Sequence, residues 1–480
     1  MEPLLLLAIC FVVAMAVVIS LVKSRSNRTP SNVTSVQVPG LHPAKGNGDQ
    51  GNLVDVATAG SLHQFLMVLH KQYGPIAGFW WGKQHVVSVA SPTIFKNLVQ
   101  VFGRPPELFK LFEPLITADS IQFANYEEGR RRRRVYDKAF SHAAISQYYS
   151  SFQKVAEEVS LKWDASSNTD DQIPLQKHMI DLAIKAIALT AFGECFKDSE
   201  NINRLQNSYD LVWEVMEVSL TVGFPEPGTD RYKRFQTGKS TIYRIVEEVI
   251  QHKQLERARD DKVLFIDYLM SLDSPINLDR VFADGLSYMI GGFHTTGNML
   301  TWALYFLACD QDAQEKLATE IQTVLGGDNV NPTNINNLTY LRQVQEETLR
   351  CSVLAPWAAK FLDDDVELGG YLIQKRTPII TALGVMLQDE KYWPDPTRFD
   401  PERFSAENMK KRQGHVFSPF GLAGKRICPG YRFAYVETAV VLATLVGRFR
   451  FKLVEDQDIK PVFGLVTHVS EEVWIKVAKR

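Results

Sequence analysis

Long helical periodicities dominate the middle of the chain. From about residue 140 to 325, apolar residues recur at helical spacing, charged residues occupy the opposite faces, and prolines are few. Residues 60–89 differ, because a helical pattern there leads through YGP into alternating apolar stretches that are typical of a β-hairpin. Together these patterns predict a mainly α fold with small β-sheets, of the α+β class.

The segment 279–309 predicts the most apolar helix of the body. Its apolar residues run nearly all the way round the helix without a proline, as in a helix at the centre of a protein. Polar residues interrupt this run, namely Asp284, His294, Thr295, Thr296 and Asn298. They argue against the alternative of a membrane span. Gly291 and Gly292 permit close approach of another group or a local bulge.

Residues 1–22 predict a transmembrane anchor. Residues 3–22 carry no charge, and a run of that length can cross about 30 Å of hydrocarbon as a helix. Basic residues follow at once, which favours a cytosolic position for the rest of the chain. A cleaved signal peptide, the alternative, fits less well because the run is too long and the charges follow it. Residues 23–52, rich in proline and glycine, predict a hinge linker, and residues 53–480 the folded domain.

Charge and cysteine content narrow the classes of partner and compartment. The formal charge is −2, with 53 Lys and Arg against 55 Asp and Glu, so no basic excess indicates a nucleic-acid partner. The five cysteines are scattered and odd in number, which does not fit a disulfide framework. The folded part is therefore expected in a reducing compartment.

One cysteine stands in an unusual turn, FSPFGLAGKRICPGYRF. Cys428 lies between Gly424 and Gly430 and directly follows Lys425, Arg426 and an isoleucine. Neighbouring cations and backbone N–H groups lower the pKa of a thiol, so this turn is suited to holding sulfur as an anion. The alternative, a buried inert cysteine, fits the other cysteines better.

A charged pair continues the apolar stripe of the helix expected at 336–354. Glu347 falls on that stripe and Arg350 follows three residues later. Such a pair is often a weak surface ion pair. On an inward face it survives only if it is paired and fully hydrogen-bonded, which requires a third partner. Arg403 in FDPERF is the candidate.

Three motifs, in this order, make the body similar to a cytochrome P-450, a haem-thiolate monooxygenase. They are Glu347-x-x-Arg350, PERF at 401–404 and the cysteine turn. The stretches DDDVELGGY and DEKYWPDPTRFDPERF also resemble the family. GSLHQFLMVLHKQYGPIAGFWWGK, ALGVMLQD and LVTHVSEEVWIKVAKR resemble its family 20, an animal branch whose members lack an established substrate.

The resemblance implies the cytochrome P-450 fold and a haem b cofactor, iron protoporphyrin IX. It implies that Cys428 is the axial ligand of the haem iron, whose thiolate pushes electron density toward O–O cleavage. Gly424 and Gly430 would let the backbone pass close under the porphyrin. Arg426 occupies the position of a haem-propionate partner.

The phenylalanine that covers the thiolate in the family corresponds to Phe420. Eight positions separate Phe420 from Cys428, where the family usually has seven. Two outcomes are therefore open: the turn bulges before Gly424, or the phenylalanine is displaced.

The sequence offers two arginines, Arg130 and Arg133, as a further contact to a haem propionate. Tyr126-x-x-x-Arg130 has the spacing of a family tryptophan–arginine motif, whereas the distance to Phe140 favours Arg133. The run of arginines here could also form a solvated basic face. Lys360 lies near a position where the family often has arginine, and it either serves the haem or is a surface lysine.

Oxygen activation is expected on the central helix. GGFHTT aligns with the family's small-Gly-x-acid-Thr element, which makes Thr295 the candidate for proton delivery. His294 takes the place of the acid, and a histidine can shuttle protons near neutral pH.

Substrate contacts are expected from residues 103–120, from residues 352–358 and from the central helix. Leu115, Phe293 and Trp357 suggest an apolar chamber, although such residues are also ordinary core residues.

The resemblance implies an enzyme of the endoplasmic reticulum membrane, single-pass, with a cytosolic catalytic domain. It would insert one oxygen atom from O₂ into a small apolar, lipid-like substrate. No dinucleotide-binding glycine motif occurs in the sequence, so electrons would come from a separate NADPH-dependent cytochrome P-450 reductase, with cytochrome b5 as a further donor. The reductase is expected to dock on the face carrying Lys425 and Arg426. Two alternatives remain: a haem-thiolate isomerase or dehydratase, and a non-catalytic haem- or lipid-binding protein.

Overall fold

The computed structural model describes residues 37–43, 48–167, 169, 171–193, 196, 199–256 and 263–480. The expected anchor at 1–22, the first part of the hinge, Cys10 and Cys195 lie outside these residues. Within the described part, no helix combines the length and the apolar character needed to cross a membrane.

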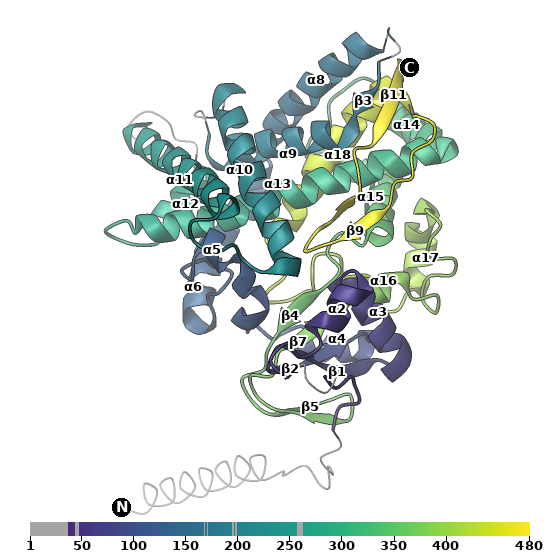
Figure 1. Cartoon of the computed structure of the whole chain (residues 1–480). Helices are drawn as coiled ribbons and strands as arrows, with labels where there is room; N and C mark the ends of the chain where they lie inside the picture. Colours follow the sequence, from purple (N-terminus) through teal and green to yellow (C-terminus); the bar gives the residue numbers. More distant parts are fainter. Residues whose placement is uncertain are drawn as a thin grey trace, which may run out of the picture.

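Helices make up most of the described chain (Figure 1). The α-helices are α2 (Leu53–Ala59), α3 (Leu62–Tyr73), α4 (Pro92–Leu98), α5 (Glu113–Ile116), α6 (Tyr126–Tyr136), α7 (His142–Ile145), α8 (Tyr149–Ser166), α9 (Leu175–Ala191), α10 (Ser199–Val222), α11 (Asp230–Glu256), α12 (Phe265–Met270), α13 (Leu278–Cys309), α14 (Gln311–Leu325), α15 (Thr339–Ser352), α16 (Leu383–Gln388), α17 (Ala406–Lys411) and α18 (Tyr431–Arg448). The 3₁₀ helices are η1 (Pro106–Phe112), η2 (Asp137–Phe140), η4 (Ile335–Asn337) and η5 (Pro401–Phe404).

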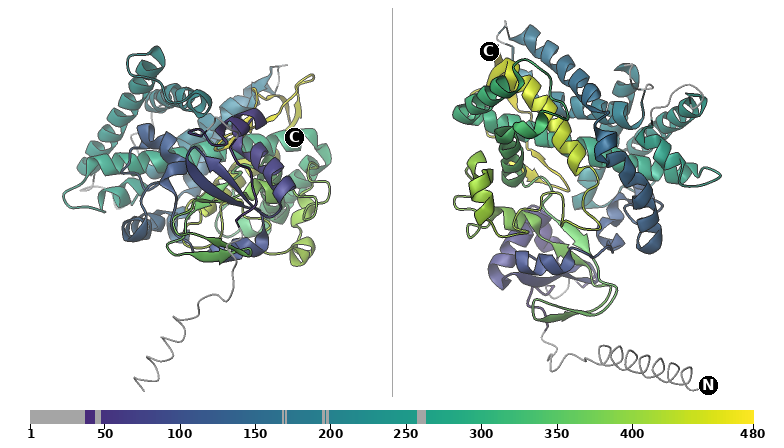
Figure 2. Two further views of the ribbon diagram at one scale, coloured as in Figure 1. Left: turned by 60° about the horizontal axis from the view of Figure 1, so that its bottom comes forward. Right: turned by 180° about the vertical axis from the view of Figure 1, so that it is seen from behind.

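Small sheets complete the fold. The strands are β1 (Ile76–Trp81), β2 (Gln84–Val89), β3 (Ile173–Pro174), β4 (Ala358–Lys360), β5 (Val366–Leu368), β6 (Tyr371–Ile373), β7 (Ile379–Thr381), β8 (Phe449–Leu453), β9 (Pro461–Phe463), β10 (Thr467–Val469) and β11 (Trp474–Lys479). They form sheets in the orders β1-β2-β7-β4, β3-β11-β8, β9-β10 and β5-β6. Figure 1 and the view from behind in Figure 2 show β1, β2, β4 and β7 with α2, α3 and α4 at one end of the molecule, away from the long helices.

The helices and the hairpin expected from the periodicity are confirmed. α3 begins after Ser61, whose hydroxyl accepts a hydrogen bond from the N–H of Gln64 at 3.1 Å, a typical N-cap. β1 and β2 pair antiparallel from Ile76 opposite Val89 to Trp81 opposite Gln84. α13 matches the expected central helix and runs as a continuous α-helix through its glycine pair, without the bulge that the sequence permits.

Described residues before residue 53, the boundary expected from composition, also pack against the folded domain. Gly40 forms a parallel bridge with Gly78 of β1, and a Cβ on Gly40 would lie 1.9 Å from the Gly78 carbonyl oxygen. The buried Asn52 side chain accepts a hydrogen bond from the Trp80 N–H at 2.9 Å. The described residues of the expected hinge therefore lie against the edge of β1.

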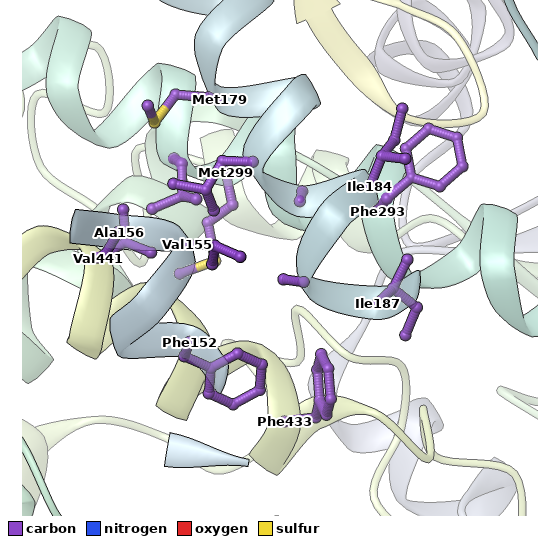
Figure 3. Close-up of a cluster of buried hydrophobic side chains, with 14 of the residues drawn as sticks. Phe152, Val155, Ala156, Met179, Ile184, Ile187, Phe293, Met299, Phe433 and Val441 are labelled. Atoms are coloured by element: carbon purple, nitrogen blue, oxygen red, sulfur yellow. The ribbon is translucent and has the colours of Figure 1, made fainter. Parts of the chain in front are cut away.

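The core surrounds α13. Figure 3 shows apolar side chains of α8, α9, α13 and α18 in one cluster, among them Phe152, Ile187, Phe293, Met299 and Phe433. Most side chains of α13 are buried, as expected of a central helix. One stretch is an exception: Gly291 is exposed and Thr295 is only half-buried. This opening in the middle of the most buried helix locates the site described next.

Candidate haem site

A tight turn presents Cys428 just before α18. The Cys428 N–H donates a hydrogen bond to the Phe420 carbonyl at 3.0 Å, which closes the turn. Gly424 has φ +139°, and a Cβ there would lie 2.2 Å from the Val99 carbonyl oxygen. Both its conformation and its close approach to that carbonyl therefore require glycine.

The additional residue of this turn lies between Phe420 and Gly424. Gly421 adopts φ +82° and its N–H donates to the Ser418 carbonyl at 3.0 Å. The Phe420 ring packs on α18, with its centroid 5.1 Å from that of Tyr435. The extra length thus forms a turn before Gly424, the first of the two outcomes left open by the sequence.

Burial and neighbouring groups act in opposite directions on the pKa of the Cys428 thiol. Burial raises the pKa of this thiol, whereas the Gly430 N–H and the cations Arg133 and Arg104 lower it. That this turn suits an anionic sulfur stays a prediction, because the Gly430 N–H and the nearby cations favour the anion while desolvation opposes it. A bound metal cation is what deprotonates a coordinating thiol.

Four basic side chains form one cluster next to the Cys428 turn: Arg104, Arg133, Lys360 and Arg426. Arg104 and Arg133 interact with the Cys428 thiol, whereas Lys360 interacts with Arg104 and Arg426. Burial, reinforced by repulsion from Arg104 and Arg133, lowers the pKa of Arg426 to about 8. Burial, together with repulsion from Arg104 and Arg426, lowers the pKa of Lys360 to about 8. Positive charges packed this closely are unfavourable by themselves and form a site for anions.

The structure separates the two arginines between which the sequence left the choice open. The Arg133 Nη2 donates to the Ile427 carbonyl at 3.0 Å, next to Cys428. Arg130 instead lies over the Phe102 ring, with its Cζ 5.1 Å from the centroid. Tyr126 is half exposed and accepts a hydrogen bond from Arg376.

The rest of the basic run does not form a solvated face. Arg131 and Arg132 both pair with Glu128, at 2.9 and 2.8 Å, and Arg132 also reaches the buried Asp284. Arg134 remains exposed and pairs with Glu127. The run is thus divided among several partners.

The expected docking face is also divided. Lys425 is exposed, but Arg426 turns inward, where its Nε donates to the Phe102 carbonyl at 3.1 Å. Its Cζ lies 4.1 Å from the centroid of the Phe102 ring. Arg426 therefore belongs to the interior cluster and not to a surface for a partner protein.

The open face of α13 carries Tyr288, Gly291 and Thr295, spaced three and four residues apart. The Thr295 hydroxyl donates to the Gly291 carbonyl at 2.7 Å, and a Cβ added at Gly291 would meet nothing within 4 Å. The Tyr288 ring stacks on Phe140, with centroids 5.7 Å apart. This face therefore borders free space in front of the Thr295 hydroxyl.

His294 points away from that face. Its ring lies edge-on against Trp213 of α10, with centroids 4.3 Å apart and planes at 68°. The side chain is buried. Helix α10 therefore covers His294. Although His294 directly precedes Thr295 in the sequence, its side chain points in a different direction from the Thr295 hydroxyl.

The inward charged cluster has the three members expected from the sequence. Arg350 donates from Nε and Nη2 to the two oxygens of Glu347, each at 2.7 Å, and both side chains are fully buried. Arg403 Nε lies 3.3 Å from Glu347 Oε1. The Asp400 N–H donates to the same oxygen at 2.9 Å, so the carboxylate ties α15 to η5.

The three expected substrate contacts lie in two apolar clusters. Leu115 and Phe293 belong to the large core, where the Phe293 ring meets Tyr209 of α10 with centroids 4.4 Å apart. Trp357 stacks on Phe109, with centroids 5.5 Å apart, in a second cluster.

Comparison with known proteins agrees with this geometry. The sequence profile of the family "Cytochrome P450" matches residues 48–475. The chain belongs to the cytochrome P450 family. It is 32% identical to Cytochrome P450 20A1 of Bos taurus over 457 residues, covering 94% of this chain and 95% of that protein. It is 30% identical to Cytochrome P450 20A1 of Homo sapiens, with the same coverage, and 26% identical to Melianol synthase CYP71BQ5 of Azadirachta indica over 90% of each chain.

Membership confirms the expected resemblance to family 20 and the enzyme class. The protein is a cytochrome P450 monooxygenase, an oxidoreductase. Proteins of this family bind haem b through a cysteine thiolate. The residues of this chain fit that cofactor, because the cations join the cysteine turn to the open face of α13. Arg104 and Arg133 each interact with both Cys428 and Tyr288, and the cluster of four cations is suited to two carboxylates.

Sequence reasoning missed some residues of the cytochrome P450 site. Arg104 is the fourth cation, and its only signal was a charge before the paired prolines of GRPPELF. Tyr288 shares a face with Thr295, which helical spacing could have indicated.

Proposed function

We propose that Cys428 is the axial ligand of haem iron and that Arg104, Arg133, Lys360 and Arg426 bind the propionates. The single observation that carries this proposal is the cluster of four cations, of which Arg104 and Arg133 interact with the Cys428 thiol. Two carboxylates would offset the burial and the repulsion that lower the pKa of Arg426 and Lys360. Gly424 lets the turn pass close to the Val99 carbonyl, and Gly430 lies close to the Cys428 sulfur. The Phe420 carbonyl accepts the hydrogen bond of the Cys428 N–H.

When bound, the haem supplies the binding and reduction of O₂ needed to oxygenate a substrate. The chain's own residues control protons and access. Thr295 places a hydroxyl on the open face of α13. This hydroxyl is held in place by its 2.7 Å hydrogen bond to the Gly291 carbonyl oxygen. His294 would exchange protons at its ring when α10 moves away from it. Leu115, Phe293 and Trp357 are proposed to exclude water from the apolar substrate.

Electrons, membrane attachment and substrate class complete the proposed function. Residues 1–22 would anchor the enzyme in the endoplasmic reticulum membrane, with residues 53–480 as the cytosolic catalytic domain. An NADPH-dependent cytochrome P-450 reductase, or cytochrome b5, would deliver electrons at a surface that includes Lys425. The substrate would be a small apolar, lipid-like compound. Incubating lipid extracts with enzyme, reductase and NADPH tests this: the expected result is an O₂-dependent mass gain of one oxygen atom in an apolar compound, and no such product would contradict it.

Variants of the α13 element should change how many electrons are lost as hydrogen peroxide. Thr295→Ala and His294→Leu are expected to raise peroxide per NADPH severalfold in a reductase-driven cycle, because each removes a proton donor. His294→Asp should keep the wild-type ratio, since a carboxylic acid can pass protons. Peroxide and NADPH are measured together, so no substrate needs to be known.

The neighbouring Thr296 provides the control. It is buried, and Thr296→Val removes the same chemical group from a position that points about 100° away from Thr295. Its ratio should equal that of the wild type. If Thr295→Ala and His294→Leu release as much peroxide per NADPH as the wild type, the proposed role of α13 in oxygen activation is wrong.

Deletion of residues 1–28 should separate attachment from cofactor binding. The shortened protein is expected to bind as much haem as the full chain but to remain largely in the supernatant after membranes are sedimented, because the uncharged run is lost. Haem content is measured per folded protein. Unchanged sedimentation with membranes would refute the anchor.

A further inference from the structure

Asp284 is a buried acid on the most apolar helix, with partners from three directions. Its side chain is fully buried. Its carboxylate accepts hydrogen bonds from the Ile121 N–H at 2.5 Å and from the Tyr136 hydroxyl at 2.6 Å, and Arg132 Nη1 lies 3.3 and 3.4 Å from its two oxygens. All these partners are donors, so the position is suited to a group that only accepts.

One of these partners, the Ile121 N–H, belongs to residues 119–124, here called the bridging segment. This segment joins η1 and α5 to α6. Its Ser120 hydroxyl lies 2.6 Å from the Ser287 hydroxyl of α13, and its Asp119 carbonyl accepts a hydrogen bond from Arg132. The segment is therefore fastened to α13 and to α6 by buried polar contacts.

The opposite side of the bridging segment holds Arg426. The guanidinium of Arg426 donates to the Ala124 carbonyl and, at 3.5 Å, to the Ile121 carbonyl. The residue Ile121 thus gives its N–H to Asp284 and its carbonyl to Arg426. A continuous chain of contacts therefore runs from Asp284 of α13, through Ile121, to Arg426, two residues before Cys428.

Stability alone does not account for this acid. A buried ion pair seldom adds stability over apolar residues of the same volume, because both charges lose their hydration. Burial indeed raises the pKa of Asp284 to about 6, against the opposing effects of Arg132, Tyr136 and the Ile121 N–H. A buried polar network of this kind does, however, fix a unique arrangement of the groups it joins.

We propose that Asp284 is a positioning residue for the haem edge: acting through Ile121, it fixes the bridging segment and the Arg426 guanidinium that contacts a propionate. This rests on the proposed role of Arg426. The same contacts hold the bridging segment against α13, so weakening them should speed the release of haem.

The test compares haem-loaded Asp284→Asn with wild type. Asparagine has the shape of aspartate but presents an NH₂ group to donors. We expect about tenfold faster haem transfer to an acceptor protein, in line with the effect of losing an outer partner of a ligand. Amide hydrogen exchange in residues 119–124 should accelerate, and the propionate bending bands in the resonance Raman spectrum should shift. A merely structural role would leave those bands in place.

Further variants keep the outcome decisive. Tyr136→Phe removes one donor from the same carboxylate without adding or removing charge, and it should cause smaller changes of the same kind even if Asp284→Asn does not fold. Trp302→Phe, at the far end of α13, removes the bond from Trp302 Nε1 to the Thr467 carbonyl and should leave haem transfer and the bands unchanged. Wild-type haem transfer and bands in Tyr136→Phe, or equal acceleration in Trp302→Phe, would overturn the proposal.

The Arg426→Ala variant distinguishes failure of the role inferred for Asp284 from failure of the role proposed for Arg426. If this variant shifts the propionate bands while Asp284→Asn does not, Asp284 does not position Arg426 and the inference is refuted. If Arg426→Ala leaves the bands unchanged, the assignment of Arg426 to a propionate fails, and the inference falls with it.

Discussion

The Cys428→Ser variant is expected to lose thiolate-ligated haem completely while its membrane association stays unchanged. A serine hydroxyl has a far higher pKa than a thiol and is a poor ligand for haem iron, and no other group in the turn replaces it. The two properties separate because the turn before α18 and the uncharged run at 3–22 are distant in sequence. The measurements are the absorption spectrum of the purified variant and its sedimentation with membranes.

Cys309→Ser is the matched control. This thiol is exposed at the end of α13, and its removal should leave the haem spectrum unchanged. A thiolate spectrum retained in Cys428→Ser would mean that another cysteine binds the iron, and the site would have to be placed elsewhere.

Glu347→Gln should destabilise the folded protein by about 3–5 kcal/mol, the usual cost of leaving a buried charge without its partner. Arg350 is fully buried and takes both oxygens of Glu347, and Arg403 approaches one of them. The amide supplies one acceptor in place of two charged ones. The free energy of unfolding from denaturant titration, together with the yield of haem-loaded protein, measures the loss.

Glu402→Gln provides the comparison for Glu347. Glu402 forms an ion pair with Lys316 in which each side chain is about half exposed, so its loss should change stability by less than about 1 kcal/mol. Equal stability of the two variants would show that the Glu347 cluster behaves as a surface pair.

The elements that depend on local pattern could be predicted from the sequence. The apolar stripe that places Glu347 inward is a property of one helix, and the structure buries it fully. The same holds for the β1–β2 hairpin and for α13. Each of these follows from helical or strand spacing within a single segment.

The parts that depend on several segments could not be predicted in the same way. Arg104, Arg133, Lys360 and Arg426 come from four separate parts of the chain, and only packing brings them together. The packing around Cys428 raises the pKa of its thiol by desolvation, and local sequence does not reveal this packing.

His294 illustrates a geometric signal that the motif alone did not give. Adjacent helix residues point about 100° apart, so His294 and Thr295 cannot share one face. Thr295 shares its face with Gly291 and Tyr288, whereas His294 turns toward Trp213 of α10. A proton path through His294 therefore requires movement of α10. The motif GGFHTT alone does not show that α10 covers this side chain.

The carbon monoxide difference spectrum of the reduced, full-length protein tests the central claim most directly. Electron donation from an axial thiolate shifts the main absorption band of the carbon monoxide complex to longer wavelength than an imidazole ligand does. If Cys428 binds the iron beside its four cations, folded and haem-loaded protein shows the red-shifted band. A folded, haem-loaded protein without that band would contradict thiolate ligation and, with it, the proposed oxygenation of an apolar substrate.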